Sequence, residues 1–302
     1  MPVPTINLHA RGPQFSRLIF GAWRLASWKL SARELLQLIH TSADLGITTI
    51  DHADLYGEYA CEELFGVALR EEPSLRSRLQ LVTKCGIKIV SAKRPSHTLK
   101  HYDTSRAHIL ASAENSLKVL HTDYLDLLLI HRPDPFMDPD DTAAAFEALV
   151  QSGKVRHVGV SNFTPSQFDL LASRLSIPLV TNQIEISVLK LSPFLDGSLD
   201  HCQRQRIAPM AWSPLGGGNL FGATPQAECA RAVLHEIGHA LPIPASVDQV
   251  ALAWLLAHPA RIVPVLGTGK ADRIRAAAAA AEIKLSREQW YKIWVACGGG
   301  VP

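Results

Sequence analysis

The sequence lacks the features that mark secreted, membrane-spanning and nucleic-acid-binding proteins. It has only five cysteines, an odd number without a Cys-x-x-Cys pair, which favours reduced thiols in a cytoplasm over a disulfide framework. It has no apolar run of about 18 residues that would span a membrane, and its first residues lack the charged and apolar regions of a signal peptide, so none is expected. The formal net charge is only +2 and the basic residues are scattered, so neither nucleic acid nor an anionic membrane is an expected partner.

What the sequence does contain is a repeated alternation of short apolar strands with helical segments. Hydrophobic residues make up 47% of the chain, which is enough for a large core. Ser31 with Glu34 forms a capping box, and Thr164–Pro165 has the pattern of an N-cap with proline at N1. We expect strands at Leu18–Trp23, Thr48–Asp51, Leu79–Lys84, Leu125–His131, Val155–Ser161, Leu179–Glu185, Ala208–Ser213 and Ile262–Gly267.

Eight strand–helix units in about 250 residues are typical of a (β/α)₈ barrel. The alternative is a doubly wound open sheet, which would require a glycine-rich turn after its first strand. The first expected strand runs into Gly21–Ala22–Trp23–Arg24 instead, without a Gly-x-Gly-x-x-Gly motif. The sequence therefore predicts an α/β protein with a single (β/α)₈ TIM-barrel domain over residues 1–302.

Polar residues fall at the ends of the expected strands, and in a barrel these ends meet at one rim, where active sites form. Helix capping alone can explain some of them, such as Ser161, but it does not explain Lys84 or His131, which follow apolar runs. The rim residues expected from the strand ends are Asp51, Lys84, His131, Ser161, Asn162, Gln183, Trp212, Ser213 and Thr268.

A lysine buried at this rim needs a carboxylate, and Asp51 on the neighbouring strand is placed to supply it. One interpretation is a purely structural ion pair. Tyr56, in the loop after Asp51, suggests another, because a nearby ammonium lowers the pKa of a phenol and prepares it to donate a proton to a carbonyl oxygen. His131 could hold the same oxygen, although a lone histidine in such a place is more often a satisfied core residue.

The later strand ends indicate a site for a planar ring that carries an amide. Trp212 offers a stacking face, with core packing as the alternative. Hydrogen bonds of the kind a carboxamide uses are offered by Ser161, Asn162 and Gln183. A turn from the last strand into a helix then predicts an anion site, unless its cations are merely a solvated helix face. The residues of this turn are Gly267, Thr268, Gly269, Lys270 and Arg273.

From Gly21 to about Arg273 the chain resembles the aldo-keto reductases. Two glycine-containing segments, Gly21–Leu25 and Gly216–Gly218, are similar to bacterial oxidoreductases of that family. The motifs that carry the resemblance are Ile50–Asp51–His52–Ala53–Asp54–Leu55–Tyr56–Gly57, Val82–Thr83–Lys84–Cys85–Gly86, Leu129–Ile130–His131–Arg132–Pro133–Asp134, Gly159–Val160–Ser161–Asn162–Phe163, Asn182–Gln183–Ile184–Glu185 and Ala211–Trp212–Ser213–Pro214–Leu215–Gly216.

The resemblance implies an NADPH-dependent enzyme that reduces small aldehydes or ketones by hydride transfer, without a metal. It implies a catalytic tetrad of Asp51, Tyr56, Lys84 and His131, with Tyr56 as the general acid. The implied contacts to extended NADPH are Gly21, Trp23, Arg24, Asp51, Ser161, Asn162, Gln183, Trp212, Ser213, Pro214, Leu215, Gly216, Gly267, Thr268, Gly269, Lys270 and Arg273. Two positions depart from the pattern: His52 stands where many relatives have threonine, and Ala277 where an asparagine often contacts adenine.

Three alternatives remain at this stage. His235–Glu236–Ile237–Gly238–His239 fits the His-Glu-x-x-His signature of zinc peptidases, but Pro242 and Ala245 stand where an extended motif would continue. A Schiff-base aldolase could use Lys84, although a lysine paired with a carboxylate stays protonated. An NADPH-binding regulatory subunit without significant turnover is the third.

Overall fold

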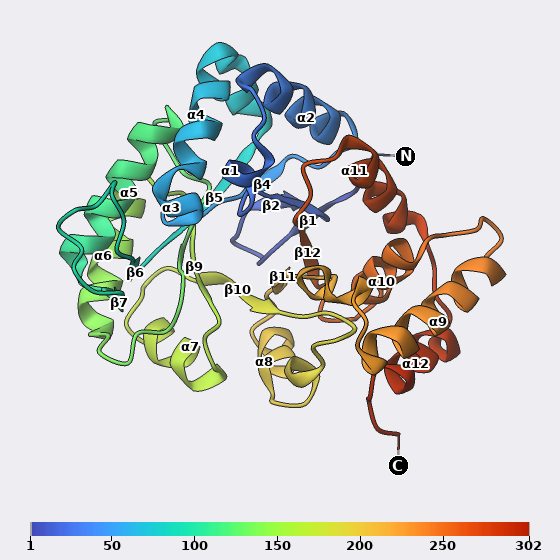
Figure 1. Cartoon of the computed structure of the whole chain (residues 1–302). Helices are drawn as coiled ribbons and strands as arrows, with labels where there is room; N and C mark the ends of the chain where they lie inside the picture. Colours follow the sequence, from blue (N-terminus) through green and yellow to red (C-terminus); the bar gives the residue numbers. More distant parts are fainter. Residues whose placement is uncertain (1, 302) are drawn as a thin grey trace.

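Eight short parallel strands lie at the centre of the molecule and close into a barrel (Figure 1). The computed structural model describes residues 2–301. The strands pair in chain order, and the last pairs with the first, which confirms the predicted single-domain (β/α)₈ TIM barrel. They are β3 (Ile19–Gly21), β4 (Thr49–Asp51), β5 (Gln80–Cys85), β8 (Leu127–Ile130), β9 (Val158–Ser161), β10 (Leu179–Glu185), β11 (Met210–Trp212) and β12 (Val263–Leu266).

Most strands are shorter than the apolar runs that predicted them, because the chain leaves the barrel ladder to form the rim loops. His131 and Ser213 therefore lie just beyond their strands rather than at their last residues. The His131 backbone N–H still donates to the Cys85 carbonyl at 2.8 Å, which keeps His131 beside the end of β5.

Helices surround the barrel in the order that the alternating pattern predicts (Figure 1). Both predicted caps are present: Ser31 and Glu34 form a capping box, and Thr164 caps a helix that begins at Pro165. The helices are α1 (Leu25–Trp28), α2 (Ala32–Asp44), α3 (Tyr56–Tyr59), α4 (Cys61–Glu71), α5 (Arg106–Leu120), α6 (Pro139–Gln151), α7 (Pro165–Ala172), α8 (Ser198–Arg204), α9 (Pro225–Ala240), α10 (Val247–Leu256), α11 (Ala271–Ala279) and α12 (Arg287–Ala296).

The helical stretch after Asp51 is broken before Cys61, and Tyr56 begins the short α3 instead of lying in a loop. Gly57 and Glu58 within α3 are both left-handed, with φ of 58° and 55°. A Cβ added at Gly57 would lie 2.7 Å from the Cys61 sulfur, so this tight turn requires glycine. The break separates the turn that carries Tyr56 from the longer α4.

Two small antiparallel sheets were not predicted from the sequence. The first pairs β1 (Thr5–Asn7) with β2 (Gln14–Ser16), and the second pairs β6 (Ile87–Lys88) with β7 (His101–Tyr102). From the first hairpin, Leu8 and Phe15 are buried among the inward-facing residues of the barrel. The Leu8 carbonyl also accepts the Ala208 N–H at 2.8 Å, just before β11. The hairpin thus covers the end of the barrel opposite the rim.

All five cysteines are free thiols, as the sequence predicts. Within residues 2–301, none of the helices combines the length and apolar character needed to cross a bilayer.

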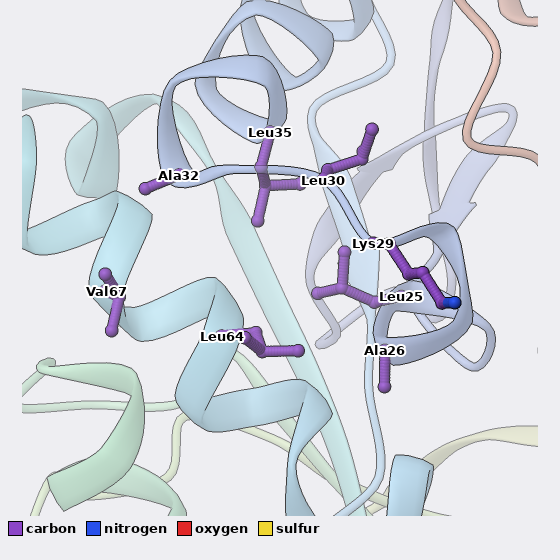
Figure 2. Close-up of a pocket in the computed structure, with 8 residues that line it drawn as sticks. All are labelled: Leu25, Ala26, Lys29, Leu30, Ala32, Leu35, Leu64 and Val67. Carbon is purple, nitrogen blue, oxygen red and sulfur yellow. The ribbon is translucent and has the colours of Figure 1, made fainter.

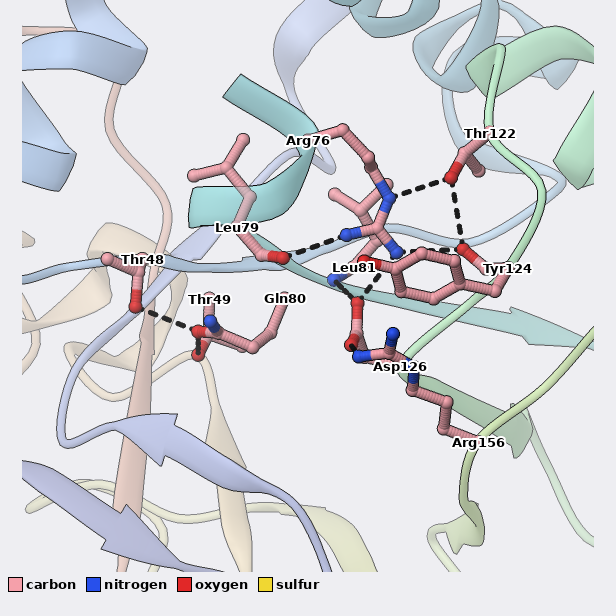
Figure 3. A network of polar contacts seen from close by, with 10 residues as sticks. All are labelled: Thr48, Thr49, Arg76, Leu79, Gln80, Leu81, Thr122, Tyr124, Asp126 and Arg156. Carbon is pink, nitrogen blue, oxygen red and sulfur yellow. Dashed lines mark hydrogen bonds and ion pairs between the residues drawn. The ribbon is translucent and has the colours of Figure 1, made fainter. Parts of the chain in front are cut away.

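A buried carboxylate joins neighbouring strands at the end of the barrel far from the rim (Figure 3). Asp126 accepts hydrogen bonds from the Leu81 N–H at 2.9 Å and from the Arg76 guanidinium at 2.8 Å. Arg156 donates to the other carboxylate oxygen at 3.2 Å, but its side chain is 54% exposed. Because Arg76 is nearly buried, it provides most of the compensation for the charge on Asp126.

Replacing Arg76 by alanine is therefore expected to lower the free energy of unfolding by about 3 kcal/mol, since it leaves a buried carboxylate without its main partner. Arg156→Ala is the matched control, and its exposed ion pair predicts a loss below about 1 kcal/mol. Urea unfolding of both variants measures the difference. Equal losses in the two variants would show that the burial of Arg76 does not determine how much its ion pair stabilises the fold.

Candidate active site

The side chain of Lys84 is fully buried in β5 and is the centre of the polar cluster at the rim. Its ammonium donates to Asp51 Oδ2 at 2.7 Å, to the His52 carbonyl at 2.8 Å and to the Tyr56 hydroxyl at 3.1 Å. These contacts use all three ammonium protons. β4 and β5 are neighbours in the barrel, so the sequence prediction that Asp51 and Lys84 meet is confirmed.

The pKa of Tyr56 in this cluster differs from the expectation. Burial raises the pKa of the Tyr56 phenol, and the Lys84 ammonium lowers it without cancelling the rise. Burial lowers the pKa of Lys84, but Asp51 and Tyr56 outweigh this and hold it above its usual value. The predicted direction of the Lys84 effect is correct, whereas a net lowering of the phenol's pKa is wrong. Tyr56 is thus protonated and Lys84 charged at neutral pH.

His131 lies beside Tyr56, with the two rings edge to face and their centroids 5.7 Å apart. Its Nδ1 is buried and has no hydrogen-bond partner within residues 2–301. Burial, together with the charges of Lys84 and Arg132, holds the pKa of His131 well below its usual value. The imidazole is therefore neutral, and it can both donate and accept a hydrogen bond at the rim.

A chain of side-chain hydrogen bonds runs around the rim from Asp51 to Trp212. The Gln183 side-chain amide donates to Asp51 Oδ1 at 2.8 Å, and the Ser161 hydroxyl donates to the backbone carbonyl of Gln183 at 2.8 Å. Asn162 donates to Ser161 Oγ at 2.7 Å and accepts from the Trp212 indole N–H at 2.9 Å. The orientation of the half-buried indole is therefore fixed relative to the Asp51–Lys84 pair.

Arg132 belongs to this cluster although the strand pattern did not single it out. Its guanidinium carbon lies 5.3 Å from the centroid of the Trp212 ring. It has no carboxylate partner among the residues that the structure describes. Its position directly after His131 is the signal that could have identified it. Arg132 thus places an uncompensated positive charge at the mouth of the site.

On the other side of the rim, the loops after β3 and β11 are tied together. Arg24 stacks at 5.2 Å over the exposed ring of Trp23 and donates to the Gly217 carbonyl at 2.9 Å. The turn after β11 contains Ser213, Pro214, Leu215 and Gly216, and both Ser213 and Gly216 have positive φ. Gly21 has a structural reason to be glycine, because a Cβ there would lie 2.5 Å from the Leu266 carbonyl oxygen.

The turn after β12 presents two free cations beside the start of α11. Lys270 and Arg273 are exposed, and neither side chain has a partner within residues 2–301. Thr268 Oγ1 accepts the Lys270 backbone N–H at 3.2 Å, and Gly269 packs closely on Trp28. Free cations at a helix N-terminus fit an anionic group such as a phosphate. The turn therefore has the chemistry expected from its sequence.

The His-Glu-x-x-His segment lies on α9, where the His235 and His239 rings are 4.3 Å apart on an exposed face. Glu236 accepts an ion pair from Lys292 at 2.6 Å, so it is not free to act as a base. In residues 2–301 the structure contains no group of three or more potential ligands that could hold a metal. Among the described residues, His235 and His239 therefore lack the third protein ligand that a peptidase-type zinc site requires.

A separate apolar pocket of about 170 Å³ lies between α1, α2 and α4 (Figure 2). Lys29 is its single charged lining residue, and the others are Leu25, Ala26, Leu30, Ala32, Leu35, Leu64 and Val67. It contains none of the acid–base side chains described above, so the chemistry resides at the rim.

Comparisons with known proteins agree with this geometry. A model described as the Aldo/keto reductase family matches residues 17–294. The chain is 53% identical over 291 residues to oxidoreductase YcsN of Bacillus subtilis (strain 168), covering 95% of each chain. It is 46% identical over 282 residues to a 6-dehydroglucose reductase of Agrobacterium fabrum (strain C58 / ATCC 33970), covering 93% of this chain and 94% of the relative.

A solved structure is similar over almost the whole length. It is the crystal structure of a thermostable aldo-keto reductase in complex with the inhibitor epalrestat. The TM-score is 0.82 at 31% identity, and the match covers 97% of this chain and 99% of the other. The chain therefore belongs to the aldo/keto reductase family of oxidoreductases.

Proposed function

We propose that this protein reduces the carbonyl group of a small aldehyde or ketone with NADPH, and catalyses the reverse oxidation. The contact between the Tyr56 hydroxyl and the buried Lys84 ammonium, at 3.1 Å, is the observation that carries the proposal. It places a proton donor beside a fixed positive charge at the rim where barrel enzymes hold their substrates. Membership of the aldo/keto reductase family supports it.

In the proposed reaction, Tyr56 donates its phenolic proton to the carbonyl oxygen. NADPH, when bound, supplies the hydride for the carbonyl carbon. Burial keeps Tyr56 protonated before the reaction, as an acid must be, and Lys84 stabilises the phenolate that forms in it. Asp51 keeps Lys84 charged, while neutral His131 orients the carbonyl oxygen.

We assign the cofactor contacts to the residues that the resemblance implies. When NADPH is bound, Trp212 would stack on the nicotinamide, and the side chains of Ser161, Asn162 and Gln183 would hold its carboxamide. Thr268 and Arg273, helped by Lys270, would hold the 2′-phosphate. The other assigned contacts are Gly21, Trp23, Arg24, Asp51, Ser213, Pro214, Leu215, Gly216, Gly267 and Gly269.

The family and the odd, unpaired cysteines support a cytoplasmic enzyme. The name of the Agrobacterium fabrum relative makes sugar-derived aldehydes the first substrates to test. A charged Lys84 is unsuited to Schiff-base formation, which disfavours an aldolase. The tight contacts among Asp51, Lys84 and Tyr56 also favour an enzyme over a regulatory subunit.

Tyr56→Phe should lower kcat for carbonyl reduction by about 10²–10⁴-fold, because it removes the proposed general acid. Tryptophan fluorescence should still report NADPH binding. Tyr59→Phe is the matched control: this phenol lies on the same short helix but accepts the Ile89 N–H at 3.1 Å and does not contact Lys84. It should keep kcat within a few-fold. Full turnover by Tyr56→Phe would remove Tyr56 as the acid.

Arg273→Ala should weaken NADPH binding about tenfold and leave NADH binding nearly unchanged, since only NADPH carries the 2′-phosphate. Arg275→Ala provides the comparison, because Arg275 is on the same helix but is paired with Asp272 at 2.8 Å. Fluorescence titration of the wild type and both variants with NADPH and NADH gives the dissociation constants. The same loss for NADH and NADPH would contradict the phosphate assignment.

A further inference from the structure

Two carboxyl groups outside the rim cluster are buried between the barrel and its helices. Glu62 is 2% exposed, and its two oxygens accept from the Thr83 hydroxyl at 2.5 Å and the Ser116 hydroxyl at 3.0 Å. Asp54 is 7% exposed, and its Oδ2 accepts from the Ser112 hydroxyl at 2.8 Å. Asp54 Oδ1 is buried without a hydrogen-bond partner in residues 2–301.

Neither carboxyl has an ion-pair partner among the described residues. Two unpaired carboxylates at this depth would be costly, so holding a proton is favoured over a second charge. Burial raises the pKa of both Asp54 and Glu62 to about 7, and for Asp54 the charge of Glu62 adds to the rise. The buried, unpartnered Oδ1 of Asp54 also favours a protonated carboxyl.

Both carboxyls are tied to the residues of the proposed proton donor. The Asp54 N–H donates to the Lys84 carbonyl at 3.0 Å, and Asp54 lies within the turn that the Tyr56 N–H closes onto Ala53 at 3.1 Å. Glu62 accepts from Thr83, which precedes Lys84 in β5. The Asp54 backbone therefore ties the turn of Tyr56 to the strand of Lys84, and the Glu62 carboxyl ties α4 to the same strand.

We propose that Asp54 and Glu62 are positioning residues for the carbonyl reduction, and that loss of a proton from this pair slows the step. The inference rests on the proposed function. When that proton leaves, a second negative charge lies near Lys84 and offsets part of its positive potential. The phenolate at Tyr56 is then less stabilised, so the rate of reduction falls as the pH rises through neutrality.

Several titratable groups around the two carboxyls stay neutral in this range. Burial raises the pKa of the Tyr59 phenol and of the Cys61 and Cys85 thiols. Burial also lowers the pKa of His52 to about 3, so it is neutral as well. The charged groups that act on the pair are Lys84 and Arg94. Because His97 contacts Tyr59 and His108 lies on α5 with Ser112, an inflection near pH 7 is assigned to the pair through variants that shift it.

The kinetic test is the single-turnover rate of carbonyl reduction by the NADPH-loaded enzyme between pH 5 and 9. The wild type should show an inflection near pH 7. Glu62→Gln removes a charge that raises the pKa of Asp54, so the inflection should move down by about one pH unit. Ser112→Ala removes a hydrogen bond that lowers that pKa, so it should move up by a similar amount.

A purely structural role for Asp54 and Glu62 does not predict that Glu62→Gln and Ser112→Ala move the inflection in opposite directions. Asp126→Asn is the matched control, because this buried carboxyl is paired with Arg76 at the far end of the barrel. It should lower the melting temperature without moving the inflection. Shifts in the same direction, or none in either variant, would overturn the proposal.

Thermal unfolding separates this inference from the proposed function. A carboxyl whose folded pKa is raised destabilises the fold progressively from its unfolded pKa near 4 up to its folded pKa near 7. The melting temperature of Glu62→Gln relative to wild type should therefore be higher at pH 8 than at pH 5. A pH-independent difference overturns the assignment of the proton to this pair. If the melting temperatures show the expected pH dependence but the protein reduces no carbonyl, the proposed function is overturned, and with it the positioning role.

Discussion

A positive charge held away from water at Lys84 is the constraint on which the site depends. An ammonium buried in a barrel is stable only if each of its protons has an acceptor. Here the acceptors are the Asp51 carboxylate, the His52 carbonyl and the Tyr56 hydroxyl. Because these come from one strand and the turn that follows it, the need to compensate Lys84 fixes the path of the chain from β4 into α3.

The hydrogen bonds that begin at Lys84 continue around the rim. Asp51 uses one carboxylate oxygen for Lys84 and the other for Gln183, so it links β5 to β10 across the barrel mouth. Asn162 continues the chain of contacts to Trp212. A change in the charge at Lys84 would therefore be transmitted to the indole through hydrogen bonds rather than through loose side chains.

The barrel and its polar rim could be predicted because they depend on short-range sequence patterns. Apolar runs ending in Asp51, Lys84 and His131 are visible in the sequence, and parallel pairing brings such ends together. The net rise of the Tyr56 pKa was not predictable, since it depends on how completely the phenol is buried. The β1–β2 hairpin was missed for a similar reason: its three-residue strands are too short to give a pattern.

The β1–β2 hairpin restricts how molecules reach the interior of the barrel. Leu8 and Phe15 close the far end of the barrel, so the barrel interior is reached from the rim. In the proposed reaction, the dinucleotide and the carbonyl compound must then arrive and depart at the same rim. Whichever molecule lies deeper enters first and leaves last, and the order of release is imposed by the shape of the barrel before any affinity is considered.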